Sequence, residues 1–403
     1  MLVADIAVIG AGISGLLLAS VLSARHSVVV LEQADAIPLG KYWLTEARAL
    51  NGHEELSTSI DRHYKALDFV AYDGLRATVS GNYHLWDTQR LTDQLSRIST
   101  AQGARFLIGH RFYSFEQAVD GIILRANAEQ INAKLLIDCM GFGSPIVGAK
   151  GVAHLTGYYI LHGCEVQNKC EFSPVALDNV LLHRHPMFFE LFPTSHGTSH
   201  AALILPSRHF KPDHAIKPEL NFILQKSHYS DYIRWNPSEK LSSYFGIIPV
   251  GRLIRPAIDR IVFFGEAGQS NPAASAVGLT RMLHIYREFA EAITNSLTKG
   301  RLRGQELCKA LPPAMDTLNR TFQEVAFEQL LSGDSDAFRL LVRDLAAYPA
   351  DVVNGLIFAD FRFTPSSVRR LLAYAIRNPD GTLARYMAGF LSRIMRRPFG
   401  TVR

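Results

Sequence analysis

The sequence has few cysteines, and their spacing is not that of a metal site. Its 403 residues include Cys139, Cys164, Cys170 and Cys308. Structural zinc sites use cysteines paired two to four residues apart, a pattern that these four do not form. We therefore predict no metal site and free thiols, which are typical of a reducing compartment.

Long apolar runs are absent as well. No uninterrupted apolar stretch approaches the roughly 20 residues that a spanning helix needs. The N-terminus enters a strand without the cationic lead and cleavage site of a signal peptide, so we expect a cytoplasmic protein. The formal net charge of +5 is modest for this length and predicts no nucleic-acid partner.

Acidic residues are scarce at the C-terminus. After Asp360 the chain carries nine arginines and a single acidic residue, Asp380. The arginines alternate with aliphatic and aromatic residues, a pattern typical of basic amphipathic helices that lie on the inner face of an anionic membrane. An ordinary helical cap with a solvated basic face has the same pattern, so both interpretations stay open.

A glycine-rich turn near the N-terminus lies between an apolar strand and an apolar helix. Gly10 permits a tight turn, Gly12 lets the backbone approach a pyrophosphate, and Gly15 allows close packing of helix on strand. The turn also contains the candidate residues Ile13 and Ser14, and the apolar helix Leu16–Leu22 continues from it. Free N–H groups and the positive end of the helix dipole at the helix N-terminus attract phosphate. The turn therefore predicts a dinucleotide-binding site.

Further candidate cofactor residues follow other predicted strands. Glu32 ends the second strand, where a carboxylate can accept hydrogen bonds from a ribose diol. The remaining candidates lie in two tracts that each follow a buried strand: Asp138 and Gly141, then Gly265, Glu266 and Gly268. The second tract resembles the Gly-Asp tract of FAD-dependent hydroxylases, with Glu266 in place of the usual Asp, and this resemblance favours FAD over NAD as the cofactor.

The order of the predicted elements indicates an α/β protein with a doubly wound, Rossmann-like FAD domain. We assign residues 1–150 and 245–300 to this discontinuous domain. Short β-like runs between them predict an inserted antiparallel β-sheet domain, residues 151–244, that binds the substrate. Residues 301–403 are predicted to form a helical C-terminal cap.

Several motifs resemble those of the lycopene cyclase family of flavoproteins. The aromatic pair Tyr42-Trp43 followed by Glu46 is similar to a segment that this family has soon after its first βαβ unit. Other similar tracts are Asp138-Cys-Met-Gly141-Phe142, Gly246-Ile-Ile-Pro249-Val-Gly251, Phe264-Gly265 and Pro272-Ala-Ala-Ser275. The resemblance implies a bound flavin and a hydrophobic substrate of isoprenoid or polyene type.

The sequence also departs from this family. Lycopene cyclases carry a Phe-Leu-Glu-Glu-Thr tract that supplies acidic residues tied to catalysis. The corresponding stretch here is His200-Ala-Ala-Leu-Ile-Leu205, which has no carboxylate. We therefore expect a flavin and a hydrophobic substrate, but not lycopene itself.

Two glutamates are candidates for the proton donor that a cyclase of this family needs. Glu46 lies close to the aromatic pair Tyr42-Trp43, and Glu190 interrupts an apolar strand. Burial beside aromatic rings would raise the pKa of either carboxyl and keep it protonated. The alternatives are a surface carboxylate for Glu46 and an outward-facing strand residue for Glu190.

Three functions are compatible with these features. The first is an FAD-dependent enzyme that cyclises or redox-modifies an isoprenoid or polyene-like substrate. The second is a monooxygenase or reductase of an aromatic or lipid substrate, with NAD(P)H as reductant. The third is a flavin- or lipid-binding protein without catalysis, which the missing acidic tract leaves open.

Overall fold

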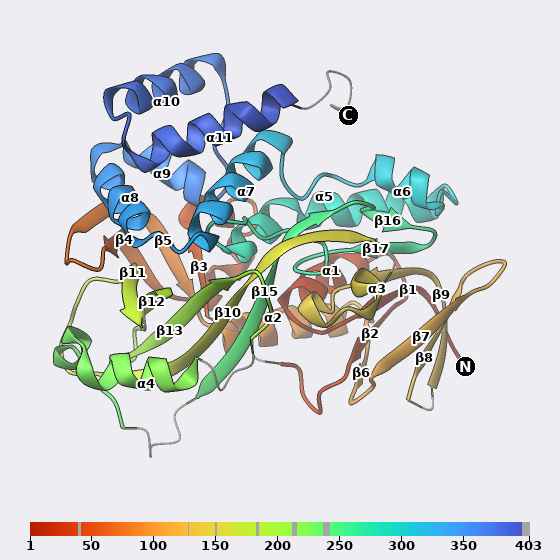
Figure 1. Ribbon diagram of the computed structural model, residues 1–403. Helices are drawn as coiled ribbons and strands as arrows, with labels where there is room; N and C mark the ends of the chain where they lie inside the picture. The colour runs from red at the N-terminus through yellow and green to blue at the C-terminus, as the bar shows by residue number, and fades with distance from the viewer. Residues whose placement is uncertain are drawn as a thin grey trace.

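The computed structural model describes residues 1–38, 42–127, 129–149, 151–182, 185–211, 216–236 and 242–396. Two sheets and a C-terminal group of helices make up the fold (Figure 1). The two sheets lie side by side, and the helices coloured blue cover the second sheet.

The first sheet contains the predicted βαβ unit. Its order is β16-β17-β9-β1-β2-β6, with the β7–β8 hairpin beside β9, and β1 pairs in parallel with both β2 and β9. The strands are β1 Leu2–Ile9, β2 Val28–Glu32, β6 Arg105–Ile108, β7 Phe112–Gln117, β8 Ile122–Ala126, β9 Glu129–Asp138, β16 Ala257–Ile258 and β17 Ile261–Phe263. The parallel strands bring their carboxyl ends to one edge, which is where doubly wound folds bind ligands.

Helices cover one face of this first sheet. The α1 helix, Ile13–Leu22, and the α5 helix, Gly278–Thr298, pack there in one apolar core with strand residues such as Ile6 and Val30. The α2 helix, Thr88–Ala101, packs beside α1, and the Asp87 carboxylate caps it by accepting from Arg90 N at 2.9 Å. Strand burial on both faces explains why the sequence of β2 is an unbroken apolar run up to Glu32.

The second sheet is larger and mostly antiparallel. Its order is β14-β10-β13-β12-β11-β4-β5-β3, with β15 also paired to β10 and with β11 parallel to β4. The strands are β3 Trp43–Glu46, β4 Ile60–Val70, β5 Arg76–Trp86, β10 Ala153–Asn168, β11 Val175–Leu182, β12 His185–Pro193, β13 Thr198–Ser207, β14 Ile233–Arg234 and β15 Ser243–Leu253.

The membership of this sheet differs from the predicted division of the chain. Residues 43–86 and 245–253, which we assigned to the FAD domain, form β3, β4, β5 and most of β15 in the second sheet. The strands β4 and β5 mix polar and apolar residues with register shifts, so their alternation is weak in the sequence. The substrate-side sheet is therefore assembled from three separate stretches of the chain.

The remaining helices lie on the two faces of the second sheet or at the ends of strands. The α4 helix packs on one face, and α8 and α9 contribute to the apolar core on the other. The helices are α3 Pro145–Gly148, α4 Lys217–Lys226, α6 Gly304–Ala310, α7 Thr317–Leu331, α8 Ser335–Ala347, α9 Ala350–Ile357, α10 Pro365–Arg377 and α11 Thr382–Arg396. Short 3₁₀ turns span Ala47–Leu50, Glu54–Ser59, Gly141–Gly143 and His228–Asp231.

The last two helices belong to the cap. Leu371 of α10 and Phe390 of α11 are buried in one cluster with Phe322 of α7. Several arginines of this region lie within 4 Å of carboxylates, including Arg385 with Asp334, Arg393 with Glu324 and Glu328 and Arg370 with Asp351. This pairing favours the helical-cap interpretation, while membrane contact stays a prediction; Arg397 and Arg403 and the side chain of Arg396 lie outside the described residues.

Within the part of the chain that is described, no helix combines the length and the apolar character needed to cross a bilayer.

Candidate functional site

The first glycine turn lies at the carboxyl end of β1, as predicted. Gly10 has a φ of +100°, and a Cβ there would lie 2.7 Å from the Cys139 carbonyl oxygen. A Cβ at Gly15 would lie 2.0 Å from the Gly10 carbonyl oxygen. Both glycines are therefore required by the close approach of the chain to itself.

Gly12 differs from these two glycines. A Cβ at this position would have no described atom within 4 Å, and the backbone is extended, with φ of −68°. The chain thus imposes no steric need for glycine here. The open space lies at the N-terminus of α1, beside Ile13 and Ser14, where a phosphate would find N–H groups and the helix dipole.

Glu32 is held next to this turn. Its carboxylate accepts from Ala11 N at 2.9 Å and from Ala34 N at 2.9 Å. The side chain is buried at the end of β2. Each carboxylate oxygen can accept a further hydrogen bond, so the arrangement fits the predicted contact with a ribose.

Asp138 makes local contacts instead. Its carboxylate accepts from Met140 N at 3.0 Å and from the Ser144 hydroxyl at 2.5 Å. Burial raises the pKa of Asp138 to about 6, and the hydrogen bond from Ser144 offsets part of that rise. These contacts indicate that Asp138 shapes the turn before Gly141, and its direct contact with the cofactor stays a prediction.

The three predicted tracts converge at one edge of the parallel sheet. A Cβ at Gly265, where φ is +68°, would lie 2.5 Å from the Ser14 Cβ. A Cβ at Gly141 would lie 3.2 Å from a Glu266 carboxylate oxygen, and one at Gly268 would lie 2.9 Å from the Phe263 carbonyl oxygen. The structure therefore brings the predicted cofactor residues together, which the sequence separates by more than 250 positions.

The third tract also contains polar atoms without partners. Within the described structure, the Gln269 Oε1, Asn271 Nδ2 and Thr280 Oγ1 atoms are buried and have no hydrogen-bond partner. Gln269 and Ala276 adopt positive φ angles of 51° and 56°, which cost energy in non-glycine residues. Unpaired buried groups and backbone strain at one segment fit a site that a polar ligand completes.

An apolar cavity of about 250 Å³ opens beside this tract, between the second sheet and the C-terminal helices. The segment Ala274–Val277 forms part of its wall, so the cavity adjoins the predicted cofactor site. Aromatic residues from the sheet and the helices line much of the rest, among them Tyr42, Trp43, Tyr159, Phe188, Phe192 and Tyr244. Such a cavity suits an apolar ligand.

Glu190 projects into this cavity from β12. Its carboxylate accepts a hydrogen bond from the Tyr42 hydroxyl at 2.6 Å. Burial raises the pKa of Glu190 to about 7, and the hydrogen bond from Tyr42 lowers it in part. Near neutral pH this carboxyl is therefore protonated in a much larger share of molecules than an exposed glutamate would be, and the alternative of an outward-facing strand residue is wrong.

Rings surround this hydrogen bond. The Tyr42 ring stacks on His200 at a centroid distance of 4.9 Å and packs against Phe192 at 5.4 Å. Burial lowers the pKa of His200, so this imidazole stays neutral. Tyr244 lines the same cavity, with its buried hydroxyl close to that of Tyr42, but it is not one of our sequence candidates.

Glu46 does not line the cavity. Glu46 ends β3, and its carboxylate lies 2.5 Å from Arg48 Nε. The Nη2 atom of the same arginine lies 3.4 Å from the Asp360 carboxylate. Burial raises the pKa of Glu46, and pairing with Arg48 opposes this rise. The contacts make Glu46 part of an ion-pair network, so the structure does not favour it as the acid.

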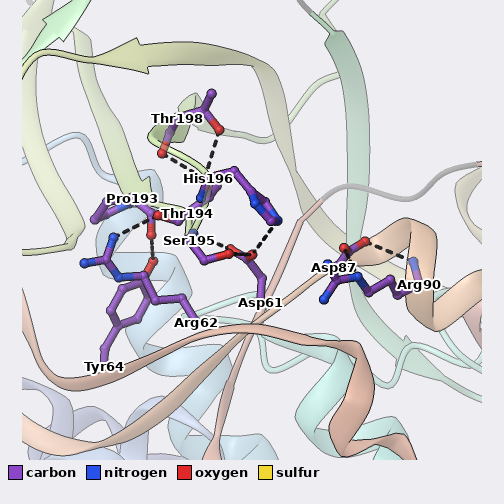
Figure 2. A network of polar contacts seen from close by, with 10 residues as sticks. All are labelled: Asp61, Arg62, Tyr64, Asp87, Arg90, Pro193, Thr194, Ser195, His196 and Thr198. Atoms are coloured by element: carbon purple, nitrogen blue, oxygen red, sulfur yellow. Dashed lines mark hydrogen bonds and ion pairs between the residues drawn. The ribbon is translucent and has the colours of Figure 1, made fainter.

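A further carboxylate organises the turn between β12 and β13 (Figure 2). Asp61 accepts from the Ser195 hydroxyl at 2.5 Å and from Ser195 N at 3.1 Å, and lies 3.5 Å from His196 Nε2. Tyr64 and Arg62 donate to the carbonyl oxygens of Pro193 and Thr194. Ser195 donates to Asp61 and not to His196, so this group fixes the turn and is not a nucleophile pair.

Comparisons with known proteins agree with this fold. Residues 5–198 match the family described as lycopene cyclase protein, while no curated protein sequence matches the chain. A geranylgeranyl bacteriochlorophyll reductase-like structure from Thermoplasma acidophilum is 15% identical with a TM-score of 0.74, over 93% of this chain and 100% of that one.

Other solved structures are similarly related. The halogenase PltM in complex with phloroglucinol and FAD is 14% identical, with a TM-score of 0.65, and the match covers 97% of this chain and 95% of that one. A flavoprotein/dehydrogenase from Cytophaga hutchinsonii is 14% identical, with a TM-score of 0.65, over 94% and 100% of the two chains. These matches confirm the predicted fold class.

We predict that Gly12→Val abolishes binding of the predicted flavin but leaves the fold intact, because its side chain enters space that the chain leaves open. Flavin absorbance of the purified variant and its far-ultraviolet circular dichroism would test this. Gly15→Val is the matched control: its Cβ would lie 2.0 Å from a carbonyl oxygen, so it should lose the fold itself. Yellow, flavin-loaded Gly12→Val protein would refute the assignment.

Glu190 should also make stability depend on pH. Because the folded-state pKa, about 7, exceeds the ordinary value of 4.5, its stabilising contribution is full below about pH 4.5 and declines as the pH rises through 7. Between pH 5 and pH 8 the wild type should lose about 2 to 3 kcal/mol more unfolding free energy than Glu190→Gln. Urea denaturation of both proteins at the two pH values measures this difference, and identical pH dependence would contradict it.

Proposed function

We propose that this chain, whose residues 5–198 match the lycopene cyclase family, is an FAD-dependent enzyme acting on a hydrophobic isoprenoid or polyene-like substrate. The observation that carries the proposal is the position of a carboxyl with a raised pKa, Glu190, in an apolar cavity that adjoins the convergent glycine tracts.

The cofactor assignment depends on the convergent tracts. Gly12 and the N-terminus of α1 would receive the pyrophosphate, and Glu32 the ribose. The unpaired atoms of Gln269 and Asn271 would face the polar part of the ligand near the cavity. When bound, FAD would supply a ring that accepts or donates a pair of electrons.

Glu190 lies on the strand next to the stretch that corresponds to the family's acidic tract and that has no carboxylate in this chain. By resemblance, that tract corresponds to His200–Leu205, which lies in β13. Glu190 on the neighbouring strand pairs directly with Ala202 in the register of β12 and β13, and both residues line the cavity. An adjacent strand thus presents a carboxyl to the same part of the cavity wall.

Asp344 is the other carboxylate among the described lining residues. It lies 3.5 Å from Arg343, and a Cβ at Gly381 would lie 2.7 Å from one of its oxygens. These surroundings tie Asp344 to the junction of α8 with the start of α11. Glu190 is therefore the better proton donor of the two.

The residues around Glu190 suit protonation of a carbon–carbon double bond. Tyr42 donates to Oε2 of Glu190, which leaves the other oxygen to present the proton. The rings of Tyr42, Tyr159 and Phe192 line the same cavity and can stabilise developing positive charge. The apolar walls exclude water that would otherwise quench such a charge.

Reaction type is the part of the proposal that an assay must decide. The purified protein would be given NADPH in air, with and without a polyene-containing lipid extract. A changed polyene without net NADPH consumption supports cyclisation, and substrate-dependent NADPH consumption supports a redox modification or a monooxygenase. Absence of flavin from the purified protein would overturn the cofactor assignment and with it the proposal. Bound flavin without any turnover would overturn the enzyme proposal in favour of a binding protein.

We predict that Glu190→Gln lowers turnover by at least about 100-fold, the usual contribution of a general acid, and leaves flavin absorbance unchanged. Glu46→Gln is the matched control, since that carboxyl lies in an ion-pair network outside the cavity. It should retain turnover within a few-fold of the wild type. The reverse ranking of the two variants would remove Glu190 as the acid.

Tyr42→Phe should shift the pH profile. The Tyr42 hydroxyl stabilises the ionised form of Glu190 and so lowers the pKa of that carboxyl. Without it the pKa rises, so the loss of rate expected of the wild type above about pH 7 should move to higher pH. Rates measured from pH 5 to pH 9 would check this; an unchanged or more acidic midpoint would contradict it.

A further inference from the structure

A second polar side chain at the cavity wall has no role in the proposed reaction. Asn179 of β11 is only 1% exposed. Neither its Oδ1 nor its Nδ2 atom has a hydrogen-bond partner in the described part of the structure. Burying an amide without a partner is unfavourable, so this group is expected to meet a polar atom that the chain does not supply.

The strand register gives the direction of this side chain. Asn179 pairs directly with Phe188 of β12, which lines the main cavity. Its neighbour Asp178 points to the opposite face, where it accepts a hydrogen bond from Tyr229 at 2.7 Å on the side covered by α4. Alternation along the strand therefore places Asn179 on the cavity side of the sheet.

A small cavity adjoins the Asn179 amide. Its volume is about 10 Å³, close to the space that one water molecule needs. It shares the lining residues Phe188, Leu330, Phe338 and Tyr386 with the main cavity. Phe188 and Phe338, whose ring centroids lie 5.1 Å apart, line both cavities, so the Asn179 amide lies next to the apolar cavity.

The amide can recognise oxygen in either of its common forms. Its Nδ2 atom donates and its Oδ1 atom accepts, which suits a hydroxyl, while the donor alone suits a carbonyl. A pure hydrocarbon in the cavity would leave both atoms unpaired. A ligand with one terminal oxygen would pair them while its apolar body fills the larger cavity.

We propose that Asn179 is a specificity-determining residue that hydrogen-bonds a single hydroxyl or carbonyl oxygen at one end of an otherwise apolar substrate. The substrate class is then an oxygenated isoprenoid and not a hydrocarbon. This inference rests on the proposed function, because it takes the main cavity as the substrate site. Sites built to bind an oxygen discriminate strongly against analogues that lack it.

The test compares two isoprenoids of the same carbon skeleton, one an alcohol and the other a hydrocarbon. Flavin-loaded protein is titrated with farnesol and, separately, with β-farnesene, and binding is followed by intrinsic tryptophan fluorescence, since Trp43 lines the cavity. Wild-type protein should bind farnesol about tenfold or more tightly than β-farnesene. Asn179→Leu should reduce this preference to within about threefold, mainly by binding the hydrocarbon better.

Controls separate Asn179 from the carboxyl. Glu190→Gln should keep the preference for farnesol, because its side chain lies on a different part of the wall. Asn179→Leu should melt no lower than the wild type, since it removes an unpaired amide. If leucine prevents folding, Asn179→Ala carries the same expectation of a lost preference.

The outcomes distinguish this inference from the proposed function. Equal binding of the two lipids by the wild type, or a preference that survives in Asn179→Leu and Asn179→Ala, would overturn the role of Asn179 alone. A preference lost in Glu190→Gln but kept in both Asn179 variants would assign oxygen recognition to the carboxyl. Binding of neither lipid would overturn the hydrophobic substrate and this inference together.

Discussion

Exclusion of water from the Glu190 carboxyl is the constraint on which the candidate site depends. A solvated glutamate is ionised at neutral pH, whereas burial raises the pKa of this one to about 7. That burial requires walls from distant parts of the chain: β12 carries the carboxyl, Tyr42 donates to it, and the C-terminal helices close the opposite side. The helical cap is thus a functional part of the cavity and not only a cover.

One short segment joins the cofactor region to this cavity. Gly265 lies against Ser14 at the glycine turn, and about ten residues later Ala274–Val277 line the cavity. The segment is anchored by Tyr159, whose hydroxyl donates to the Ala274 carbonyl, and by Gln323, which accepts from Ala274 N. Its strained φ angles and unpaired polar atoms lie between the candidate cofactor site and the apolar cavity. A rigid segment at this place would fix the position of the cofactor relative to the substrate.

Prediction succeeded where local sequence and local structure coincide. The glycine turn, its strands and its helix have short-range steric requirements, such as the contact of Gly15 with the Gly10 carbonyl, and these are visible in a few residues. The sequence analysis did not single out β4 and β5, and their pairing, which contains two register shifts, is visible only in the structure. It also could not choose between Glu46 and Glu190, since both lie near aromatic residues in the sequence.

The sequence by itself determined the dinucleotide-binding turn, the α/β class and the resemblance to a flavoprotein family, because those depend on residues within one βαβ unit and on short tracts. Only the tertiary structure decided which carboxyl is buried in the apolar cavity and that Asn179 has no partner. The physical reason is that desolvation and hydrogen-bond satisfaction depend on everything that surrounds a side chain. In this protein those surroundings come from strands and helices that are up to about 300 residues apart in the chain.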